Sequence, residues 1–424
     1  MNRRLLACIG AGAATTMALA ACSSGGGSGD SATGGSDGSG DAVTITYSNF
    51  ISNGGNEDNL AKIVAAFEDE NPDITVDVTT LAYADYFTAL QTDLAAGTPA
   101  DVFDIEYANY ASYQDSGVLA PIEVADPGAY DPTLLETYQT DSTQYALPTS
   151  FSDVVLYYNK DLFDAAGQAY PDATWTWADE TAAAEAIADP DAGVFGDFQN
   201  ISYYEFYKVL EQNGASFLND DGSAVAFNTP EGIEAAQWLV GKSGTTMPTA
   251  EQGAGTPDFD SQLFVDGKLA MLHSGIWMFG TFADSTSAWD IAVEPGSTTQ
   301  ASAMFSNAAA VSATSKHQEA AAKWAEYLSG SDVAAQTRLD AGWELPPISD
   351  QTVLSTYLDK GTPDNRQAVF DSLENVALPP ALGDAQAQVA DIVDAQLGEA
   401  AAGRLTAAEA VAEMETQINA LLAG

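Results

Sequence analysis

Apolar residues in the first part of the chain switch between strand spacing and helix spacing. They alternate with polar residues at 43–47, 74–78 and 101–105, as in strands, and recur every three or four positions at 60–67 and 87–94, as in amphipathic helices. Strand, helix, strand, helix and strand in so short a stretch predict a parallel sheet covered by helices. Ligands of such sheets gather beyond the carboxyl ends of the strands.

The stretch 147–167 predicts a segment that leaves this sheet and starts another one. Pro148 favours an extended start, apolar residues then alternate, and a short helix is predicted at 159–166 before Gly167. A second extended stretch is predicted at 302–311. We interpret both stretches as crossings between two lobes, which together would form a hinge.

Helix spacing and capping residues characterise most of the remaining chain. Thr176 predicts the cap of one helix, and Thr229 with Pro230 predicts the start of another. A buried strand predicted at 269–272 places Trp277 at a corner between strand and helix. Further helices are predicted at 200–212, at 319–328, at 333–339 and along the stripe Val411, Met414, Ile418 and Leu421.

The N-terminal residues have the pattern of an export signal. Two arginines precede a weakly apolar run at 5–20, which is short for a membrane span. The small residues before Cys22 and the Ser/Gly tract after it resemble the lipobox of bacterial lipoproteins. This resemblance implies a lipoprotein signal peptide at 1–21, a lipidated (palmitate-bearing) Cys22 and a Ser/Gly/Asp tether within 22–41.

Composition narrows the classes of function. Removal of the leader would leave 11 basic against 61 acidic residues, a net charge of −50. This charge argues against nucleic-acid binding, which requires clustered Lys and Arg, and it disfavours anionic ligands. Removal would also leave Cys22 as the one cysteine, which excludes disulfides, thiol catalysis and cysteine metal sites. With 46% hydrophobic residues, the chain has ample material for two or three domains.

Several segments, spread over most of the chain, occur in the order typical of one family. They are the lipobox at Cys22, NLAKIVAAFEDENPDITV (59–76), LAAGTPADVF (94–103), VLYYNKDLFDAAG (155–167), FVDGKLAMLHSGIWM (264–278) and SNAAAVSATSKHQEAAAKWAEYL (306–328). Each segment alone has an ordinary structural use. Together they resemble the sugar-binding proteins of bacterial ABC importers, which are similar in build to maltose-binding protein.

This resemblance implies an α/β fold with two lobes, the periplasmic-binding-protein type II fold or Venus-flytrap clamp. Each lobe would be a mostly parallel sheet flanked by helices, and crossing strands would join the lobes. The first lobe would comprise 42–150 and 301–345, and the second 151–300 and 346–424, with the C-terminal helices open to sharing between them.

The resemblance also implies a role in transport. A substrate-binding lipoprotein would capture a mono- or oligosaccharide between its lobes and deliver it to the transmembrane permease subunits of the importer. The protein would be a monomer on the outer face of the cytoplasmic membrane, held by its lipid, in a Gram-positive bacterium. Such binding requires no catalytic residue, no cofactor and no metal, so we expect no enzymatic activity.

Sugar binding indicates which residues form the site. Aromatic rings meet the apolar face of a pyranose, and Asn, Asp, Glu and Gln meet its hydroxyl groups. Trp277 is the first candidate, because Gly275 lets the backbone approach there. Glu106 and Tyr107 follow, since they lie at the end of the third strand. The other predicted ligand-binding residues are Asn49, Asn53, Ser150, Phe151, Tyr204, Trp343 and Glu344.

Three alternatives remain open at this point. Acidity favours a polyamine as ligand, and the tyrosine pairs at 157–158 and 203–204 suggest ferric iron. An exported glycosidase would need two carboxylates across a cleft, for which Asp104 and Glu106 are candidates. His273 and His317 are the only histidines and lack the spacing of a zinc site.

Overall fold

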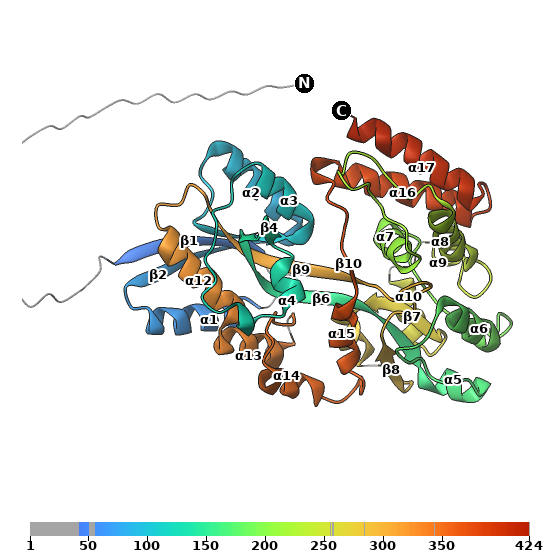
Figure 1. The fold of residues 1–424 in the computed structure, drawn as a ribbon. Coiled ribbons are helices and arrows are strands. Elements are labelled where there is room, and N and C mark those ends of the chain that lie inside the picture. The colour runs from blue at the N-terminus through green and yellow to red at the C-terminus, as the bar shows by residue number, and fades with distance from the viewer. Residues whose placement is uncertain are drawn as a thin grey trace, which may run out of the picture. The chain divides into compact units, whose positions relative to one another are not determined.

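The computed structural model describes residues 42–50, 56–254, 256, 258–283, 285–342 and 344–423 (Figure 1). Three residues with predicted roles, Cys22, Asn53 and Trp343, lie outside these ranges. None of the helices in the described ranges is both long and apolar enough to span a membrane.

The parallel sheet predicted from the first part of the chain is confirmed. Strands β1 (Val43–Phe50), β2 (Ile74–Leu81) and β3 (Val102–Glu106) are parallel, with β1 between the other two. Helices α1 (Glu57–Glu70) and α2 (Tyr83–Ala96) connect them. We refer to this sheet and the helices on it as the first lobe.

Two long strands carry the sheet from the first lobe into the second. The strand β9 (Ser302–Val311) pairs antiparallel with β3 on one side and with β6 (Ala146–Asn159) on the other. The strand β6 continues to pair with β7 (Met271–Gly275) and β8 (Trp289–Ala292). The main order β2-β1-β3-β9-β6-β7 is therefore one sheet, and β6 and β9 cross its middle (Figure 1).

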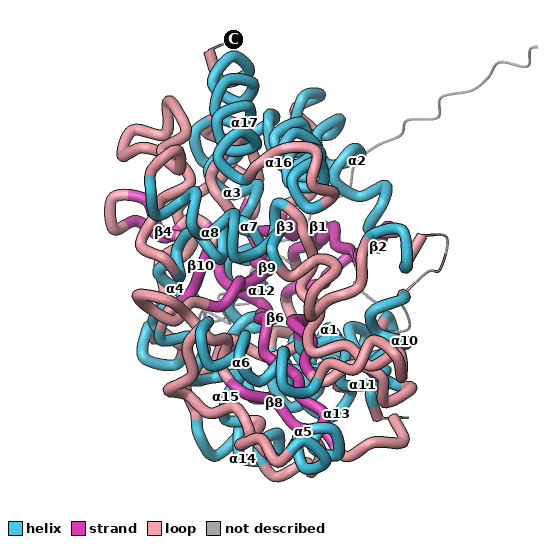
Figure 2. Tube along the Cα trace, turned by 90° about the vertical axis from the view of Figure 1, so that its right-hand side faces the viewer, coloured by secondary structure: helices cyan, strands magenta, loops and turns pink. Residues whose placement is uncertain are grey.

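Hydrophobic clusters form on both sides of these crossing strands. In the first lobe, α12 (Gln318–Gly330) buries Trp324 against β1 and α1, and α13 (Asp332–Ala341) packs beside α1. In the second lobe, α7 (Tyr203–Gln212) and α8 (Pro230–Gly241) pack with the C-terminal helices α16 (Gln386–Ala401) and α17 (Ala407–Leu422). The helices thus surround the strands, as Figure 2 shows.

A third segment passes between the lobes beside β6. After α13 the chain forms a bridge in which the backbone N–H of Phe151 donates to the carbonyl of Leu345, at 3.0 Å. It then leads into α14 (Gln351–Leu358) and α15 (Gln367–Asp371). Residues of both helices join a hydrophobic cluster with β6, β7 and β8. The chain therefore crosses three times.

Local signals set several element boundaries. Asn159 caps α5 (Lys160–Ala166) by accepting from the N–H of Leu162, and Gly167 ends it with φ of 66°. Thr176 forms a capping box at the start of α6 (Trp177–Ile187). The remaining elements are α3 (Tyr107–Asp115), α4 (Pro132–Glu136), α9 (Ala250–Gly253), α10 (Phe259–Val265), α11 (Phe279–Phe282), β4 (Gln139–Thr140), β5 (Thr143–Gln144) and β10 (Val376–Ala377).

Candidate ligand-binding site

One face of the crossing strands is open between the lobes. Ser150 pairs with Asn307 and Ser152 pairs with Phe305, and residues paired directly in antiparallel strands project to the same face. Ser152 is the one residue of β6 that is not fully buried, and Phe305 and Asn307 are the two of β9. This face can therefore form the floor of a site.

An aromatic row lies at the second-lobe end of this floor. It consists of Tyr204 from α7, Phe305 from β9 and Trp277, which follows β7. The ring of Phe305 lies 6.0 Å from that of Tyr204 and 5.6 Å from that of Trp277, between ring centroids. Tyr204 and Trp277 are each 47% exposed, which is unusual for such large side chains in the described part of the chain. Three elements thus present rings at one place.

A polar cluster lies at the first-lobe end of the same floor. The hydroxyl of Ser150 donates to the carboxylate of Glu344, and the amide of Asn307 donates to both, at 3.2 Å. Asn49, at the end of β1, accepts from the hydroxyl of Thr80 at 3.1 Å. These side chains line a small cavity together with Tyr47, Phe50, Leu60, Asp104, Thr149 and Arg338.

Asp104 gives this cavity a group that can titrate near neutral pH. Burial raises the pKa of Asp104, and a hydrogen bond from the Tyr47 hydroxyl at 2.8 Å lowers it, as does the charge of Arg338. The negative charge of Glu344 raises it further, and the resulting pKa is about 7. The polar end of the site can therefore take up or release a proton.

Glu106 and Tyr107 follow one another where β3 ends and α3 begins. Glu106 closes β3 and pairs with Asn307 of β9. Burial and then the negative charge of Glu106 raise the pKa of the Tyr204 hydroxyl. Tyr107 begins α3, and its ring packs edge-on against Tyr138 with centroids 6.3 Å apart. Burial raises the pKa of Tyr107.

Phe151 stands apart from the other predicted site residues. Alternation along β6 turns its side chain to the opposite face from its neighbours Ser150 and Ser152. There it is buried in a hydrophobic cluster, with its ring 6.2 Å from that of Phe370. The structure places Asn49, Glu106, Ser150, Tyr204, Trp277 and Glu344 along the open face, whereas Tyr107 packs on Tyr138 and Phe151 faces the opposite side.

Sequence reasoning missed Phe305, Asn307 and Arg338. A signal existed for the first two, because Phe305 and Asn307 are an aromatic and an amide side chain on a strand face whose other residues are alanine and valine. Arg338 carried no signal, since it lies on a helix whose polar and apolar residues show little segregation.

Trp177, at the start of α6, is packed within the second lobe. Its ring stacks on Trp238 at 4.1 Å, and its indole N–H donates to Gln212.

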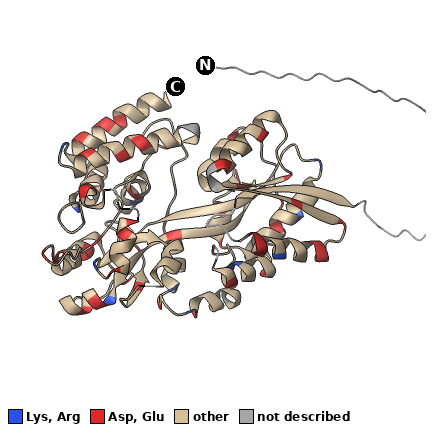
Figure 3. Ribbon diagram, turned by 180° about the vertical axis from the view of Figure 1, so that it is seen from behind, with Lys and Arg blue, Asp and Glu red and all other residues tan. Residues whose placement is uncertain are grey.

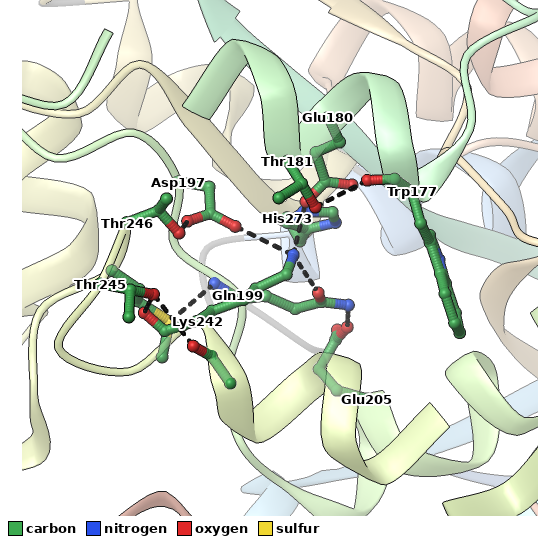
Figure 4. Close-up of polar contacts among 12 residues, drawn as sticks. Trp177, Glu180, Thr181, Asp197, Gln199, Glu205, Lys242, Thr245, Thr246 and His273 are labelled. Atoms are coloured by element: carbon green, nitrogen blue, oxygen red, sulfur yellow. Dashed lines mark hydrogen bonds and ion pairs between the residues drawn. The ribbon is translucent and has the colours of Figure 1, made fainter. Parts of the chain in front are cut away.

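Glu180, Asp197 and His273 are arranged closely enough to suggest a metal site, with their ligand atoms within 4.8 Å of one another. Their centre already contains a cation of the protein itself. The ammonium of Lys242 lies 2.5 Å from Glu180, 2.9 Å from Asp197 and 2.8 Å from the amide oxygen of Gln199 (Figure 4). An ion pair therefore explains this cluster without a metal.

Comparison with known proteins identifies the family. The sequence matches the family described as bacterial extracellular solute-binding protein over residues 53–335. The galactooligosaccharide-binding protein of Bacillus subtilis is 26% identical over 350 residues, 79% of each chain. The maltodextrin-binding protein MdxE of the same organism is 24% identical over 293 residues, 68% of this chain and 67% of the relative.

A solved structure extends this relationship to the fold. The ABC substrate-binding protein Lmo0181 from Listeria monocytogenes, in complex with cycloalternan, is 38% identical and superimposes with a TM-score of 0.78. The match covers 90% of this chain and 100% of that chain, so both lobes are included. The protein belongs to the family of bacterial extracellular solute-binding proteins, and its fold is their two-lobed α/β clamp.

Proposed function

We propose that this protein is the carbohydrate-binding component of an ABC import system, with an oligosaccharide as its ligand. The observation that carries the proposal is the exposed aromatic row of Tyr204, Phe305 and Trp277 beside a polar cluster on one open face. Aromatic rings stack on the apolar face of a sugar ring, while carboxylate and amide groups bind its hydroxyls. The similarity to relatives named for binding maltodextrin and galactooligosaccharide, and to a relative solved in complex with cycloalternan, supports this proposal.

The proposed site residues have two roles. Trp277 and Tyr204 stack on the sugar, and Phe305 supports both rings from below. Asn49, Glu106, Ser150 and Glu344 bind hydroxyl groups, with Tyr107 at the edge of the first lobe. Asn53 and Trp343 stay predictions as contacts, because they lie outside the described residues.

Closure of the two lobes on the sugar completes the mechanism that we propose. The hinge would be the three crossing segments, with lobes of 42–150 plus 301–345 and 151–300 plus 346–424. A ligand that contacts both lobes stabilises the closed form and shifts the population towards it. The closed complex would then dock on the permease, which a separate ATPase drives.

Lipid attachment at Cys22 is part of the proposal. It would hold a monomer on the outer face of the cytoplasmic membrane of a Gram-positive bacterium. Replacement of Cys22 by Ala should release the protein into the culture medium, whereas the unchanged protein should stay with the membrane fraction. Equal release of both proteins would refute the anchor.

We also propose that the protein has no enzymatic activity. Asp104 and Glu106 share a face of β3, but Asp104 is buried with a hydroxyl donor, where a glycosidase would expose both groups to the substrate. The iron alternative gains no support from the tyrosine pairs, because Tyr157 and Tyr203 are completely buried in hydrophobic clusters.

Calorimetric titration tests the proposal directly. The panel comprises cycloalternan, maltotetraose, a galactooligosaccharide, spermidine and ferric citrate. At least one saccharide should bind, and Trp277→Ala should weaken this binding at least tenfold. Tyr170→Ala is the matched control, because Tyr170 is another exposed aromatic residue, at 38%, and it contacts Tyr158 and Phe163 instead of the row. A response to spermidine or iron alone, or hydrolysis of a saccharide, would refute the proposal.

A further inference from the structure

The core of the second lobe contains a closed ring of ionic contacts and hydrogen bonds. Each member contacts the next, and the last contacts the first. In order they are Glu205, Lys208, Glu294, His273, Glu180, Lys242 and Gln199. They come from α6, α7, the end of α8, β7, the segment after β8 and the loop before α7. We call this set the ionic ring.

The first half of the ionic ring joins α7 to β7. The ammonium of Lys208, which is 0% exposed, lies 2.6 Å from Glu205 and 2.7 Å from Glu294. Glu294 in turn lies 2.9 Å from Nδ1 of His273, on β7. Two elements that are distant in sequence are thereby held at a fixed separation.

The second half returns from β7 to α7, and Figure 4 shows most of it. Nε2 of His273 lies 3.0 Å from the carboxylate of Glu180. The same carboxylate forms an ion pair with the ammonium of Lys242. Lys242 also donates to the amide oxygen of Gln199, at 2.8 Å. The amide nitrogen of Gln199 then donates to Glu205, at 2.7 Å, and this contact closes the ring.

The signs of charge alternate around the ionic ring, with Gln199 as the neutral link. The alternation requires His273 to be a cation. Each of its ring nitrogens faces a carboxylate, and both nitrogens can donate only when both carry a proton. Glu294, Glu180, Lys242 and Asp197 are the charged groups around this imidazole.

The ionic ring is linked to the aromatic row through the backbone. Glu205 follows Tyr204 on α7, and His273 precedes Trp277 by four residues at the end of β7. The ionic ring thus connects α7, which carries Tyr204, with β7, which leads into Trp277. Phe305 lies between them on β9.

Stability alone does not account for such an arrangement. Burial of paired charges is costly, and replacing them by packed hydrophobic residues is often neutral or stabilising. The protein has only 13 Lys and Arg residues, and the ribbon in Figure 3 shows few blue positions for them among many red positions for Asp and Glu. Two lysines and one of the two histidines nevertheless belong to this one buried set. A role in holding the surrounding elements at fixed positions explains better why these few basic residues are buried together.

We propose that the ionic ring is a positioning device that sets the separation of Tyr204 and Trp277 and thereby the sugar affinity of the aromatic row. The part about affinity rests on the proposed function. Lys208 and His273 are positioning residues, because they touch the ligand-binding residues only through the elements that they join.

Lys208→Met tests the proposal, with Lys160→Met as matched control. Lys160 also pairs with a buried carboxylate of the second lobe, Asp290 at 2.9 Å, but has no contact with the ionic ring. Calorimetry with cycloalternan should show affinity at least tenfold weaker in Lys208→Met and within twofold of the unchanged protein in Lys160→Met. Equal affinities in all three proteins would refute the proposal.

A readout that needs no ligand separates this proposal from the proposed function. In protein labelled with 5-fluorotryptophan, the ¹⁹F resonance of Trp277, assigned through Trp277→Phe, reports the position of the ring. Lys208→Met should shift it and Lys160→Met should not. If the unchanged protein binds no saccharide, the proposed function fails, and the resonance alone decides about the ionic ring.

Titration of the unchanged protein provides a test that does not depend on the folding of a variant. Loss of the second proton of His273 breaks the alternation of charges. The Trp277 resonance should therefore move, and cycloalternan affinity should fall, with an inflection near pH 9. A constant resonance from pH 7.5 to pH 10 would overturn the proposal.

Discussion

The ring of Trp277 lies directly against the backbone of Gly275. A methyl group on Gly275 would be 1.9 Å from Cζ3 of Trp277, far inside contact distance. The φ angle of Gly275 is −78°, so alanine fits the backbone and only the ring must move. Gly275→Ala should therefore weaken saccharide binding at least tenfold, measured by calorimetry, with little change in thermal stability.

Gly280→Ala is the control for this change. Gly280 is five residues away on the short helix α11, and no atom lies within 4 Å of the position that its new methyl group would take. Its affinity should match that of the unchanged protein. If Gly275→Ala also bound normally, the Trp277 ring would not be a ligand contact.

Asp153 is a buried acid in a crossing strand, and replacing it should stabilise the protein. Apart from its own backbone N–H, no hydrogen-bond donor among the described residues reaches either oxygen of its side chain, and burial raises its pKa well above the usual value. Because the folded state holds this proton, the acid costs stability as pH rises above 3.8. Asp153→Val should raise the free energy of unfolding at pH 7 by about 1–3 kcal/mol.

Denaturant titration measures this gain, and Asp290→Val is the matched comparison. Asp290 is also a buried acid on a strand, but it is paired with Lys160 and accepts from the N–H of Asn365. Its replacement should destabilise the protein, because it leaves the N–H of Asn365 without this acceptor and leaves Lys160 with only the exposed Asp364, at 3.3 Å. If Asp153→Val lost stability instead, the prediction would be wrong, and the carboxyl group of Asp153 would have a stabilising hydrogen-bond or ionic partner in solution.

The ionic ring predicts how stability depends on pH. The carboxylates of Glu294 and Glu180 outweigh burial and raise the pKa of His273 to about 9. The stability it contributes is therefore complete below its ordinary pKa of 6.5 and is lost as pH rises through 9. Lys242 and His273 lower the pKa of Glu180 to about 2, so its contribution is complete above 4.5 and is lost as pH falls through 2.

Scanning calorimetry between pH 2 and pH 10 should thus show the highest unfolding temperature between these two losses. His273→Gln should remove the alkaline loss. The control is the second histidine, His317, which is exposed. The variant His317→Gln should keep the alkaline loss of stability. An alkaline loss that persisted in His273→Gln would have to come from another group.

The polar end of the site predicts a coupled titration. Burial and the charge of Glu344 hold the pKa of Asp104 near 7, against the opposing effects of Tyr47 and Arg338. Glu344→Gln removes one negative charge, so the pKa of Asp104 should fall. Carboxyl ¹³C NMR from pH 4 to pH 9 measures this shift, and Glu319→Gln, an exposed change on α12, should leave it in place.

Elements with their own local signals could be predicted from the sequence. The crossing strand β9 has the predicted bounds, and α6 begins after the predicted cap at Thr176. The helix α3 was missed because its aromatic and polar residues give almost no helical periodicity. The short strand β8 was missed because four residues carry too little pattern.

The site could be predicted only in part, for a physical reason. Trp277 and Glu106 were predicted because ends of strands face the space where ligands gather in such folds, and they stay predictions as ligand contacts. The ionic ring has no sequence signature, because Glu180 and His273 come into contact only after the second lobe has folded. Whether a side chain faces ligand or core also depends on register, as the burial of Phe151 next to Ser150 shows.

Three crossings are an odd number, and this places the two ends of the described chain in different lobes. The chain enters at β1 in the first lobe and finishes in α17, which packs with α7 and α8 in the second. A tether at the N-terminal end would hold the first lobe near the membrane, and the second lobe would then move relative to it during closure. Fluorophores attached near residues 42 and 423 would therefore sense that swing from its two sides, without any label inside the site.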